Sequence, residues 1–244
     1  MTVKPYHTER TKKEEVREMF DRIAPRYDLL NHVLSLEIDK LWRRRVVAEV
    51  ARTAPREVLD VATGTGDLAL GMARRMPECR ITGVDLSERM LAEARRKAAA
   101  RKLDDRTTFE QGDAEHLAAA DGAFDAVTVA FGVRNFGDLD AGLRELARVT
   151  RPGGRAVILE FSQPRNRVIR AFYGFYAGHI LPRIGGAVSR DRQAYDYLPA
   201  SVRVFPAPEE FCTRMLQAGF AEVRVRSLSC EIAHIYIGYN FTPK

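Results

Sequence analysis

Residues Glu57–Asp67 read EVLDVATGTGD, and this stretch decides the fold of the chain. A short apolar run that ends in closely spaced glycines is typical of a buried strand followed by a tight turn. Gly64 and Gly66 allow backbone conformations that other residues rarely adopt, and a helical pattern begins at Leu68. The order strand, glycine turn, helix predicts a site where backbone N–H groups face a bound ligand.

This turn is compatible with two kinds of cofactor. Gly64, Gly66 and Ala69 fit the dinucleotide pattern G-x-G-x-x-G/A, and Asp85 lies 19 residues beyond Gly66, near the spacing of a ribose-binding acid. Asp60 lies just before the glycines, where a carboxylate favours a cationic or amino-bearing ligand over a pyrophosphate. Alternatively, Asp60 only caps the turn.

Composition predicts one sizeable α/β domain with extra helices, because the chain has 244 residues, 45% of them hydrophobic. The cysteines, Cys79, Cys212 and Cys230, are scattered, and the five histidines are dispersed. We therefore expect no disulfide framework and no metal site. A polar N-terminus and the lack of a long apolar run predict a soluble, cytoplasmic protein.

The net charge of +6 is unevenly distributed along the chain. Residues 1–56 carry 13 Lys and Arg against 9 Asp and Glu, and residues 161–203 carry 7 Arg against 2 Asp. A basic face can meet anionic lipid headgroups or nucleic acid. It can also be ordinary solvated surface charge.

The first 50 residues are expected to form helices that cover the sheet. Apolar residues recur with helical spacing over about Glu14–Ala24, and Pro25 follows. The next segment holds a dense set of hydrogen-bonding side chains: Tyr27, Asp28, Asn31 and His32. These side chains could clamp a polar ring or close over a cofactor, or they could cap helices.

Polar residues follow each of the next strands, where ligands bind in open α/β sheets. Asp85 ends the second strand and is placed to accept hydrogen bonds from a ribose diol. Asp113 and Ala114 follow the third strand, Thr107–Gln111, and could read the amino group and a ring nitrogen of adenine; Asp113 could also cap a helix. Arg134 and Asn135 fall just beyond the fourth strand.

The remainder of the chain predicts three more strands and three more helices. A helix from Leu139 is expected to stop at Pro152–Gly153. The apolar helix within residues 165–186 could pack on the core, line a groove for a lipophilic substrate or touch a membrane. Tyr195 and Tyr197 are expected in a polar turn, and a helix over Pro208–Ala218 precedes the last two strands.

The motif order resembles a class I S-adenosylmethionine methyltransferase: DVATGTGD, GVDLS, GDAEHL, FDAVTVAFGVRN and RVTRPGGRAVILEFS. Within that superfamily the chain is similar to the menaquinone/ubiquinone biosynthesis C-methyltransferases. Tyr27–Trp42, YDLLNHVLSLEIDKLW, and Arg148–Ser162 carry this closer likeness. The resemblance implies a Rossmann-like α/β fold with a seven-stranded, mostly parallel sheet, an antiparallel last strand, helices on both faces and an N-terminal helical lid.

The resemblance also implies S-adenosyl-L-methionine as the cofactor, S-adenosyl-L-homocysteine as its product, and no metal. Cofactor contacts are expected from Asp60, Thr63, Gly64, Gly66, Asp85, Asp113 and Ala114. The reaction implied is methyl transfer to a ring carbon of a prenylated demethylmenaquinol, with a benzoquinol intermediate of ubiquinone biosynthesis as a second acceptor.

Five residues are candidates for a role in catalysis. Arg134 is expected to stabilise the quinol phenolate and lower its pKa, and Asn135 and Tyr27 to orient the ring. A base must then remove the ring proton, and His32, Asp28 or a water held by them could serve. The family pattern usually has His where this chain has Asp39, so no catalytic role is assigned there.

The domain prediction is a helical lid over residues 1–50 and a methyltransferase domain over 51–244, with a helical substrate-side insert at about 165–205. The basic flanks prompt a nucleic-acid methyltransferase as one rival. However, AFGVRN stands where amine-methylating enzymes usually carry Asn/Asp-Pro-Pro-aromatic, so no nucleic-acid partner is expected. A nicotinamide oxidoreductase and a non-catalytic cofactor-binding scaffold are the other rivals. Transient contact with the inner face of the membrane and a homodimer are also expected.

Overall fold

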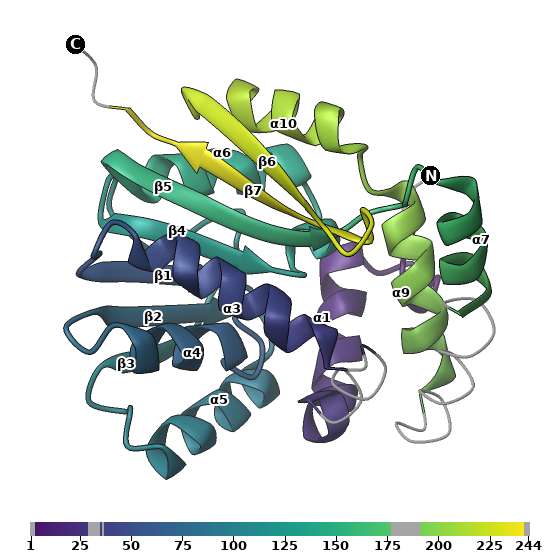
Figure 1. The fold of residues 1–244 in the computed structure, drawn as a ribbon. Helices are drawn as coiled ribbons and strands as arrows, with labels where there is room; N and C mark the ends of the chain where they lie inside the picture. The colour runs from purple at the N-terminus through teal and green to yellow at the C-terminus, as the bar shows by residue number, and fades with distance from the viewer. Residues whose placement is uncertain (1–2, 29–34, 36, 177–190, 242–244) are drawn as a thin grey trace.

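The computed structural model describes residues 3–28, 35, 37–176 and 191–241, which form one sheet with helices on both faces (Figure 1). The sheet has seven strands in the order β3-β2-β1-β4-β5-β7-β6. The strands are β1 (Glu57–Val61), β2 (Arg80–Asp85), β3 (Thr107–Gln111), β4 (Phe124–Ala130), β5 (Thr150–Phe161), β6 (Glu222–Leu228) and β7 (Ala233–Tyr239). Strand β7 runs antiparallel to β5 and β6, which confirms the predicted fold class.

The strand order reverses beside β1, and this reversal positions the site. Val61 at the end of β1 pairs with Val84 of β2 on one side and with Val129 of β4 on the other, both in parallel register. The connections from β1 and from β4 therefore leave the sheet in opposite directions. A crevice opens at the carboxyl ends of the strands at such a point.

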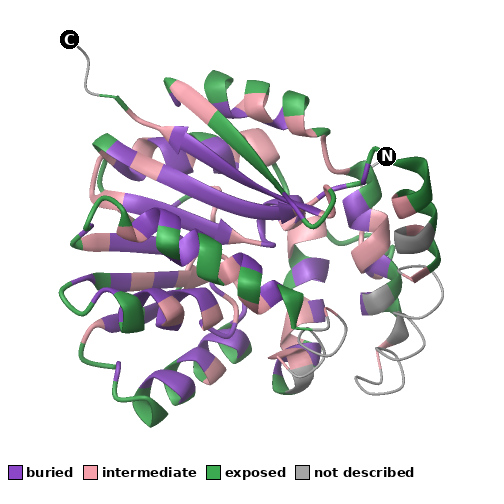
Figure 2. Ribbon diagram, viewed as in Figure 1, coloured by how far each residue is buried: buried purple, intermediate pink, exposed green. Residues whose placement is uncertain are grey.

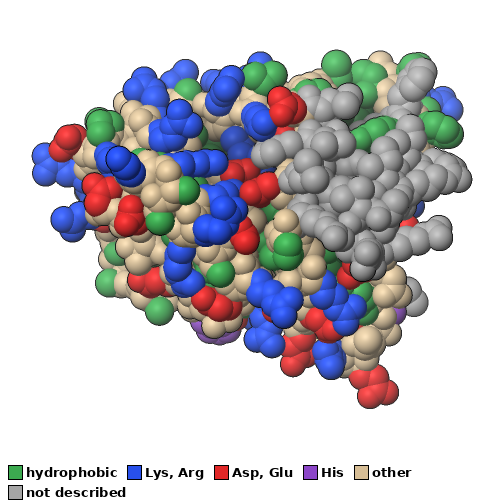
Figure 3. All heavy atoms as spheres, turned by 90° about the horizontal axis from the view of Figure 1, so that it is seen from below, with side chains coloured by type: hydrophobic (Ala, Val, Ile, Leu, Met, Phe, Trp, Pro, Cys, Tyr) green, Lys and Arg blue, Asp and Glu red, His purple; other side chains and the backbone are tan. Residues whose placement is uncertain are grey.

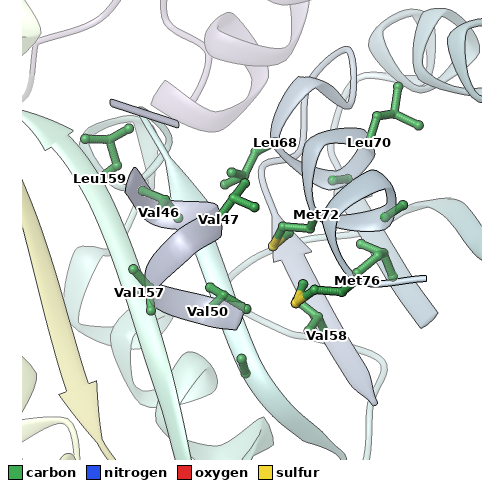
Figure 4. Packing of buried hydrophobic residues seen from close by; sticks show 14 of the residues in the cluster. Val46, Val47, Val50, Val58, Leu68, Leu70, Met72, Met76, Val157 and Leu159 are labelled. Carbon is green, nitrogen blue, oxygen red and sulfur yellow. The ribbon is translucent and has the colours of Figure 1, made fainter. Parts of the chain in front are cut away.

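Helices cover the two faces of the sheet through two apolar clusters. One face carries α3 (Ile38–Ala51), α4 (Asp67–Arg75) and α5 (Glu88–Ala100), and the other carries α6 (Leu139–Val149) and α10 (Pro208–Gln217). Figure 4 shows Val46, Val47 and Val50 of α3 beside Leu68 and Met72 of α4, over the sheet residues Val58 and Val157. The central parallel strands β1 and β4 and the second half of β5 are almost continuously buried (Figure 2), as expected for parallel strands covered on both faces.

A third group of helices lies at the edge where the parallel strands end (Figure 1). It comprises α1 (Lys12–Ile23), the 3₁₀ turn η1 (Ala24–Arg26), α7 (Arg167–Phe175) and α9 (Arg192–Val204). Helix α1 has the capping box that Thr11 and Glu14 form at its start. Val16, Met19 and Ile23 of α1 pack against Met90 of α5 and against α9.

Two predictions about local structure are wrong. Pro152 and Gly153 do not stop a helix, because α6 ends at Val149 and β5 begins at Thr150. The ladder to β4 is irregular at this point, and a bulge accommodates a proline that lacks a donor. Tyr197 lies inside α9, whose start Asp191 caps by accepting from Ala194 N at 3.1 Å.

Three side chains also face a different way from what their local spacing predicts. Lys97 follows Glu93 by four residues, a spacing that predicts an ion pair on the helix surface, but it turns inward and is 8% exposed. The helical spacing of α10 predicts Leu216 on the inward face, and the alternation of β6 predicts Val225 on the covered face, yet they are 47% and 48% exposed. In each case the neighbouring elements, and not the local pattern, decide which face is covered.

Among the described residues, no helix is both long and apolar enough to span a bilayer. The part of the apolar segment beyond Tyr176, including Ile180 and Gly185, lies outside the described residues.

Two glycine-to-alanine changes in helices should have opposite effects on stability. At Gly142 of α6 an added Cβ would lie 2.6 Å from Cε2 of Phe136, and overpacking of this kind costs about 1–3 kcal/mol. At Gly174 of α7 nothing lies within 4 Å, so Ala should stabilise the helix by about 0.5–1 kcal/mol. Urea unfolding of Gly142→Ala and Gly174→Ala measures both effects, and equal shifts would contradict the packing at Phe136.

Candidate functional site

A cleft with an empty volume of about 710 Å³, part of it open to solvent, lies at the carboxyl ends of β1, β2, β3 and β4. Strand-end loops form one wall, and α1 with the segment after it forms the other. The predicted site residues that line the cleft are Tyr27, Gly64, Asp85, Asp113, Ala114 and Asn135.

The glycine turn and Asp85 form the floor of the cleft. Gly64 has a φ of +56°, and its amide donates to Asp85 Oδ2 at 2.8 Å. The other carboxylate oxygen accepts from Ser87 N at 2.9 Å. Burial raises the pKa of Asp85, and the amides of Ser87 and Gly64 oppose this effect. A carboxylate has about four acceptor positions, so Asp85 retains capacity for a ribose diol.

Gly66 serves the packing of this turn and does not line the cleft. It has a φ of +78°, and a Cβ there would lie 3.0 Å from Cβ of Ala94 and 3.1 Å from the ring of Phe109. The close approach of α5 and β3 therefore requires glycine at this position. Thr63 is also behind the wall, where its hydroxyl donates to Asp60 Oδ2 at 2.7 Å.

Asp60 is buried beneath the turn, with 1% of its surface exposed. It accepts from the hydroxyls of Thr63 at 2.7 Å and Thr128 at 2.6 Å. Burial raises the pKa of Asp60 to about 6, and the two hydroxyls limit the rise. These contacts match the turn-capping alternative, while cofactor binding by Asp60 stays a prediction.

Asp113 meets a lysine from α1 at the β3 end of the cleft. Lys13 Nζ lies 2.6 Å from Asp113 Oδ2 and 2.8 Å from Glu115 Oε2. Burial alone would raise the pKa of Asp113, but the Lys13 ammonium and the Glu115 amide hold it below its usual range. Asp113 thus joins the third strand's end to the helix across the cleft.

Helix α1 crosses the cleft and is held at both ends. Lys12 Nζ donates to the carbonyls of Arg134 at 2.8 Å and Phe136 at 2.7 Å. Burial beside Arg134 lowers the pKa of Lys12 to about 8. At the other end Asp21 accepts from Ser87 Oγ at 2.6 Å. Between these anchors, Val16, Arg17 and Phe20 line the cleft.

Arg134 lies behind the cleft wall, in the 3₁₀ turn η2 (Val133–Asn135), and is 7% exposed. Its Nη1 donates to Glu160 Oε1 at 2.6 Å and to the Phe131 carbonyl at 2.5 Å. Glu160 is fully buried, so it compensates the arginine's charge. Among the described residues, Nε of Arg134 has no hydrogen-bond partner.

Asn135 faces the cleft and is oriented by a residue from the insert. Tyr197 Oη of α9 donates to Asn135 Oδ1 at 3.0 Å, which fixes the amide oxygen on the side of α9. Burial raises the pKa of Tyr197 to about 12, although Arg134 acts in the opposite direction, so the phenol is a donor at neutral pH. Tyr27 lies across the cleft, with its ring against Gly64.

Backbone strain marks the ends of the two central strands. Ala62 after β1 has a φ of +52° and Phe131 after β4 has a φ of +60°. Gly132 allows these turns to approach, since a Cβ there would lie 2.6 Å from Cβ of Ala62. Strain of this kind gathers at functional sites and costs of the order of 1–3 kcal/mol per residue.

Some of the predicted catalytic residues could not be placed, and others were missed. His32 and Asn31 lie outside the described residues. The sequence pattern did not point to the α1 residues Lys12, Lys13 and Arg17. It also did not reveal Tyr197 as the partner of Asn135. The basic pair Lys12–Lys13 at the start of an amphipathic helix was the one feature of the sequence that could have indicated these contacts. Within the described ranges, no cluster of three or more His, Cys, Asp or Glu could hold a metal ion.

Known proteins resemble this chain over nearly its whole length. The model of the ubiE/COQ5 methyltransferase family matches residues 8–240. A demethylmenaquinone methyltransferase from Deinococcus radiodurans is 49% identical over 96% of both chains. A ubiquinone/menaquinone biosynthesis C-methyltransferase from Syntrophotalea carbinolica is 46% identical over 94% of this chain and 96% of its own.

A solved structure shares the fold alone. It is phosphoethanolamine N-methyltransferase 2 from Haemonchus contortus in complex with S-adenosyl-L-methionine. The TM-score is 0.59 at 15% identity, over 81% of this chain and 53% of that one.

The buried carboxyl of Asp60 should make stability depend on pH. Its pKa is about 6 in the folded protein and about 3.9 in an unfolded chain. The folded protein therefore keeps this proton up to a higher pH than the unfolded chain does. Wild-type stability should therefore fall relative to Asp60→Asn as pH rises from about 4 to about 6, by up to about 3 kcal/mol. Urea unfolding at several pH values measures the difference, and a constant difference across this range would contradict the assignment.

Proposed function

This chain belongs to the ubiE/COQ5 methyltransferase family, and we propose that it moves a methyl group from S-adenosyl-L-methionine to a ring carbon of a prenylated demethylmenaquinol. A benzoquinol precursor of ubiquinone is the second acceptor, because relatives at similar identity include enzymes named for both pathways. The observation that carries the proposal is the cleft, where two acidic strand ends face an aromatic and an amide side chain.

The cleft provides distinct sites for the parts of the cofactor. Asp85 is the ribose ligand, because it ends β2 in the cleft with acceptor capacity beyond its two backbone bonds. Asp113 and the Ala114 amide receive the adenine edge, with the apolar side chains of Val16 and Met90 nearby. The strand-end backbone at Ala62 and Gly64 receives the amino-acid portion.

Helix α1 is the cover of this site. It lines the cleft between its anchors at Arg134 and Ser87, so a bound nucleoside would lie beneath it. Removal of water from the nucleoside strengthens the bonds to Asp85 and Asp113. The helical lid of residues 1–50 therefore acts chiefly through α1 and the segment that carries Tyr27.

The acceptor ring lies between Tyr27 and Asn135, on the glycine-turn side of the cleft. S-adenosyl-L-methionine supplies the electrophilic methyl group. Asn135, held by Tyr197, orients a quinol hydroxyl, and Tyr27 stacks on the ring. Arg134 provides positive charge behind Asn135, reduced by its pairing with Glu160, and favours the phenolate form of the acceptor. Alignment is the main contribution required of these residues.

The first test is turnover of labelled S-adenosyl-L-methionine with reduced short-chain demethylmenaquinol and, in parallel, a demethylated benzoquinol. We expect methyl transfer to the naphthoquinol, and transfer to the second acceptor would extend the substrate range. Titration with S-adenosyl-L-homocysteine and with NAD serves as the control for the cofactor. Failure on both acceptors with S-adenosyl-L-homocysteine bound would overturn the quinol assignment and retain the cofactor site.

Contact with an anionic membrane surface is proposed for α7, since the acceptor's prenyl tail resides in lipid. Val168 and Phe175 are 64% and 59% exposed on this helix, and Arg167 and Arg170 flank them as exposed cations. Amphipathic helices of this composition bind at lipid interfaces. Among the described residues on the face shown in Figure 3, basic and acidic side chains are intermixed.

Flotation with vesicles of anionic and of zwitterionic lipid tests the α7 surface. Arg167→Glu with Arg170→Glu should abolish recovery with anionic vesicles, because each cation near the surface contributes about 1 kcal/mol. The matched control is Arg44→Glu with Arg45→Glu, two exposed arginines of α3. Equal binding by both variants would contradict the proposal. The proposed setting is the cytoplasmic face of the membrane. The chain is also proposed to form a homodimer, and analytical sedimentation measures its mass in solution.

A further inference from the structure

A lysine is buried beneath the glycine turn, in a position where sequence spacing predicted a surface pair. Lys97 of α5 is 8% exposed. Its Nζ lies 2.7 Å from Asp28 Oδ2, 2.5 Å from Asp67 Oδ1 and 3.1 Å from Thr65 Oγ1. A buried ammonium is costly unless it is paired and hydrogen-bonded, and here three groups from two segments, the glycine turn into α4 and the residues after η1, satisfy it.

The three partners of Lys97 all adjoin the functional site. Thr65 belongs to the glycine turn, and Asp67 is the first residue of α4. Asp28 directly follows Tyr27, which lines the cleft. Lys97 therefore connects the strand that carries the cofactor turn to the segment that carries the aromatic side of the acceptor site.

Both carboxylate oxygens of Asp28 take part in these contacts. Its Oδ1 accepts from Thr65 Oγ1 at 2.5 Å, and its Oδ2 accepts from Lys97. A carboxylate that already accepts from an ammonium and a hydroxyl is a poor candidate for the base that removes the ring proton. Its geometry instead fixes the backbone of the preceding residue, Tyr27.

The position of Tyr27 depends on this anchor. The point where a Cβ on Gly64 would stand is 4.0 Å from Cε1 of Tyr27, so the ring lies on the glycine turn itself. The edge of Tyr27 also meets the ring of Phe20, with centroids 5.9 Å apart. The Tyr27 side chain thus lies on the glycine turn, and the next side chain, that of Asp28, is hydrogen-bonded to Thr65, the residue after Gly64.

A second cation supports the network from α3. Arg43 pairs with Asp39 and lies 3.9 Å from Asp67 Oδ2. Its guanidinium also lies over the ring of Phe131, at 5.6 Å from the centroid, and Phe131 lines the cleft after β4. The polar layer under the cleft thus extends from α5 through the glycine turn to α3.

We propose that Lys97 is a positioning residue for methyl transfer, which acts through Asp28 to hold Tyr27 over the glycine turn. The proposal rests on the proposed function for its kinetic consequence and on the contacts of Asp28 for its structural one. Lys97 touches neither cofactor nor acceptor, since the cleft lining does not include it. It should therefore affect turnover more than cofactor affinity.

The experiment compares Lys97→Met with Lys97→Arg, Asp28→Asn and the double variant Lys97→Met/Asp28→Asn. The matched control is Lys102→Met, an exposed lysine just beyond the same helix. For each protein, kcat is measured with saturating S-adenosyl-L-methionine, along with the Kd for S-adenosyl-L-homocysteine and the thermal midpoint. Amide exchange in the peptide that contains Arg26–Asp28 is followed as a readout that needs no turnover.

Lys97→Met and Asp28→Asn should each lower kcat at least about tenfold, since small misplacements at a reacting centre have effects of this size. The Kd should change less than about threefold, because Asp85 and Asp113 are untouched. The double variant should be no slower than the slower single variant, as expected for residues that act as a unit. Lys97→Arg should recover part of the turnover, and Lys102→Met should match the wild type.

The outcomes separate this proposal from the proposed function. If the wild-type protein methylates no quinol, the proposed function is overturned. Faster amide exchange at Arg26–Asp28 in Lys97→Met, but not in Lys102→Met, still supports the role of Lys97 in anchoring Asp28 and Tyr27. Unchanged exchange in Lys97→Met overturns the anchor. Independent, multiplicative losses of kcat overturn it as well. If Lys97→Met does not fold, Asp28→Asn carries the same comparison, because it leaves Lys97 paired with Asp67.

Discussion

The hydrogen bond from the Gly64 amide to the Asp85 carboxylate is the constraint on which the rest of the structure depends. It ties the turn after β1 to the end of β2 and aims the carboxylate into the cleft. Gly66 then lets α5 and β3 close against the turn, and buried Asp60 holds Thr63 beneath it. A single carboxylate thereby holds the turn to β2 and, in the proposed function, also binds the ribose of the cofactor.

Buried ion pairs lie behind the two residues of the proposed acceptor site, Asn135 and Tyr27. Glu160 compensates Arg134 behind Asn135, and Asp28 with Asp67 compensates Lys97 behind Tyr27. Pairs of this kind add little net stability, but loss of one partner strands the other and costs about 3–5 kcal/mol. Their value lies in geometry, because each pair fixes a loop that carries a cleft residue. Rigid placement suits a reaction in which alignment is the main contribution of the protein.

Helix α1 links these two sides. Its Lys13 reaches Asp113 at the end of β3, and its Lys12 reaches the carbonyls around Arg134. In the proposed function, the cover over the cofactor and the wall beside the acceptor are therefore parts of one element. A solved structure at 15% identity shares the fold of this protein, and such likeness shows the fold alone. The proposed activity depends instead on the residues that α1, the glycine turn and α9 bring together.

The sequence by itself determined the strand–turn–helix unit, the seven-stranded sheet and the acids at the ends of β2 and β3. These features follow from the period of the apolar residues, the spacing of the glycines and the position of acids after strands, which are all local signals. It also predicted the first helix and the position of Arg134 and Asn135 just beyond the fourth strand, but not the burial of Arg134 behind the cleft wall. It misplaced Lys97, Tyr197 and the Pro152 turn, since each depends on neighbours far along the chain. Lys97 meets Asp28, Lys13 meets Asp113, and Tyr197 meets Asn135. Only the tertiary structure could decide these partnerships, because the burial of a charged or polar side chain is favourable only where a distant segment supplies its partner.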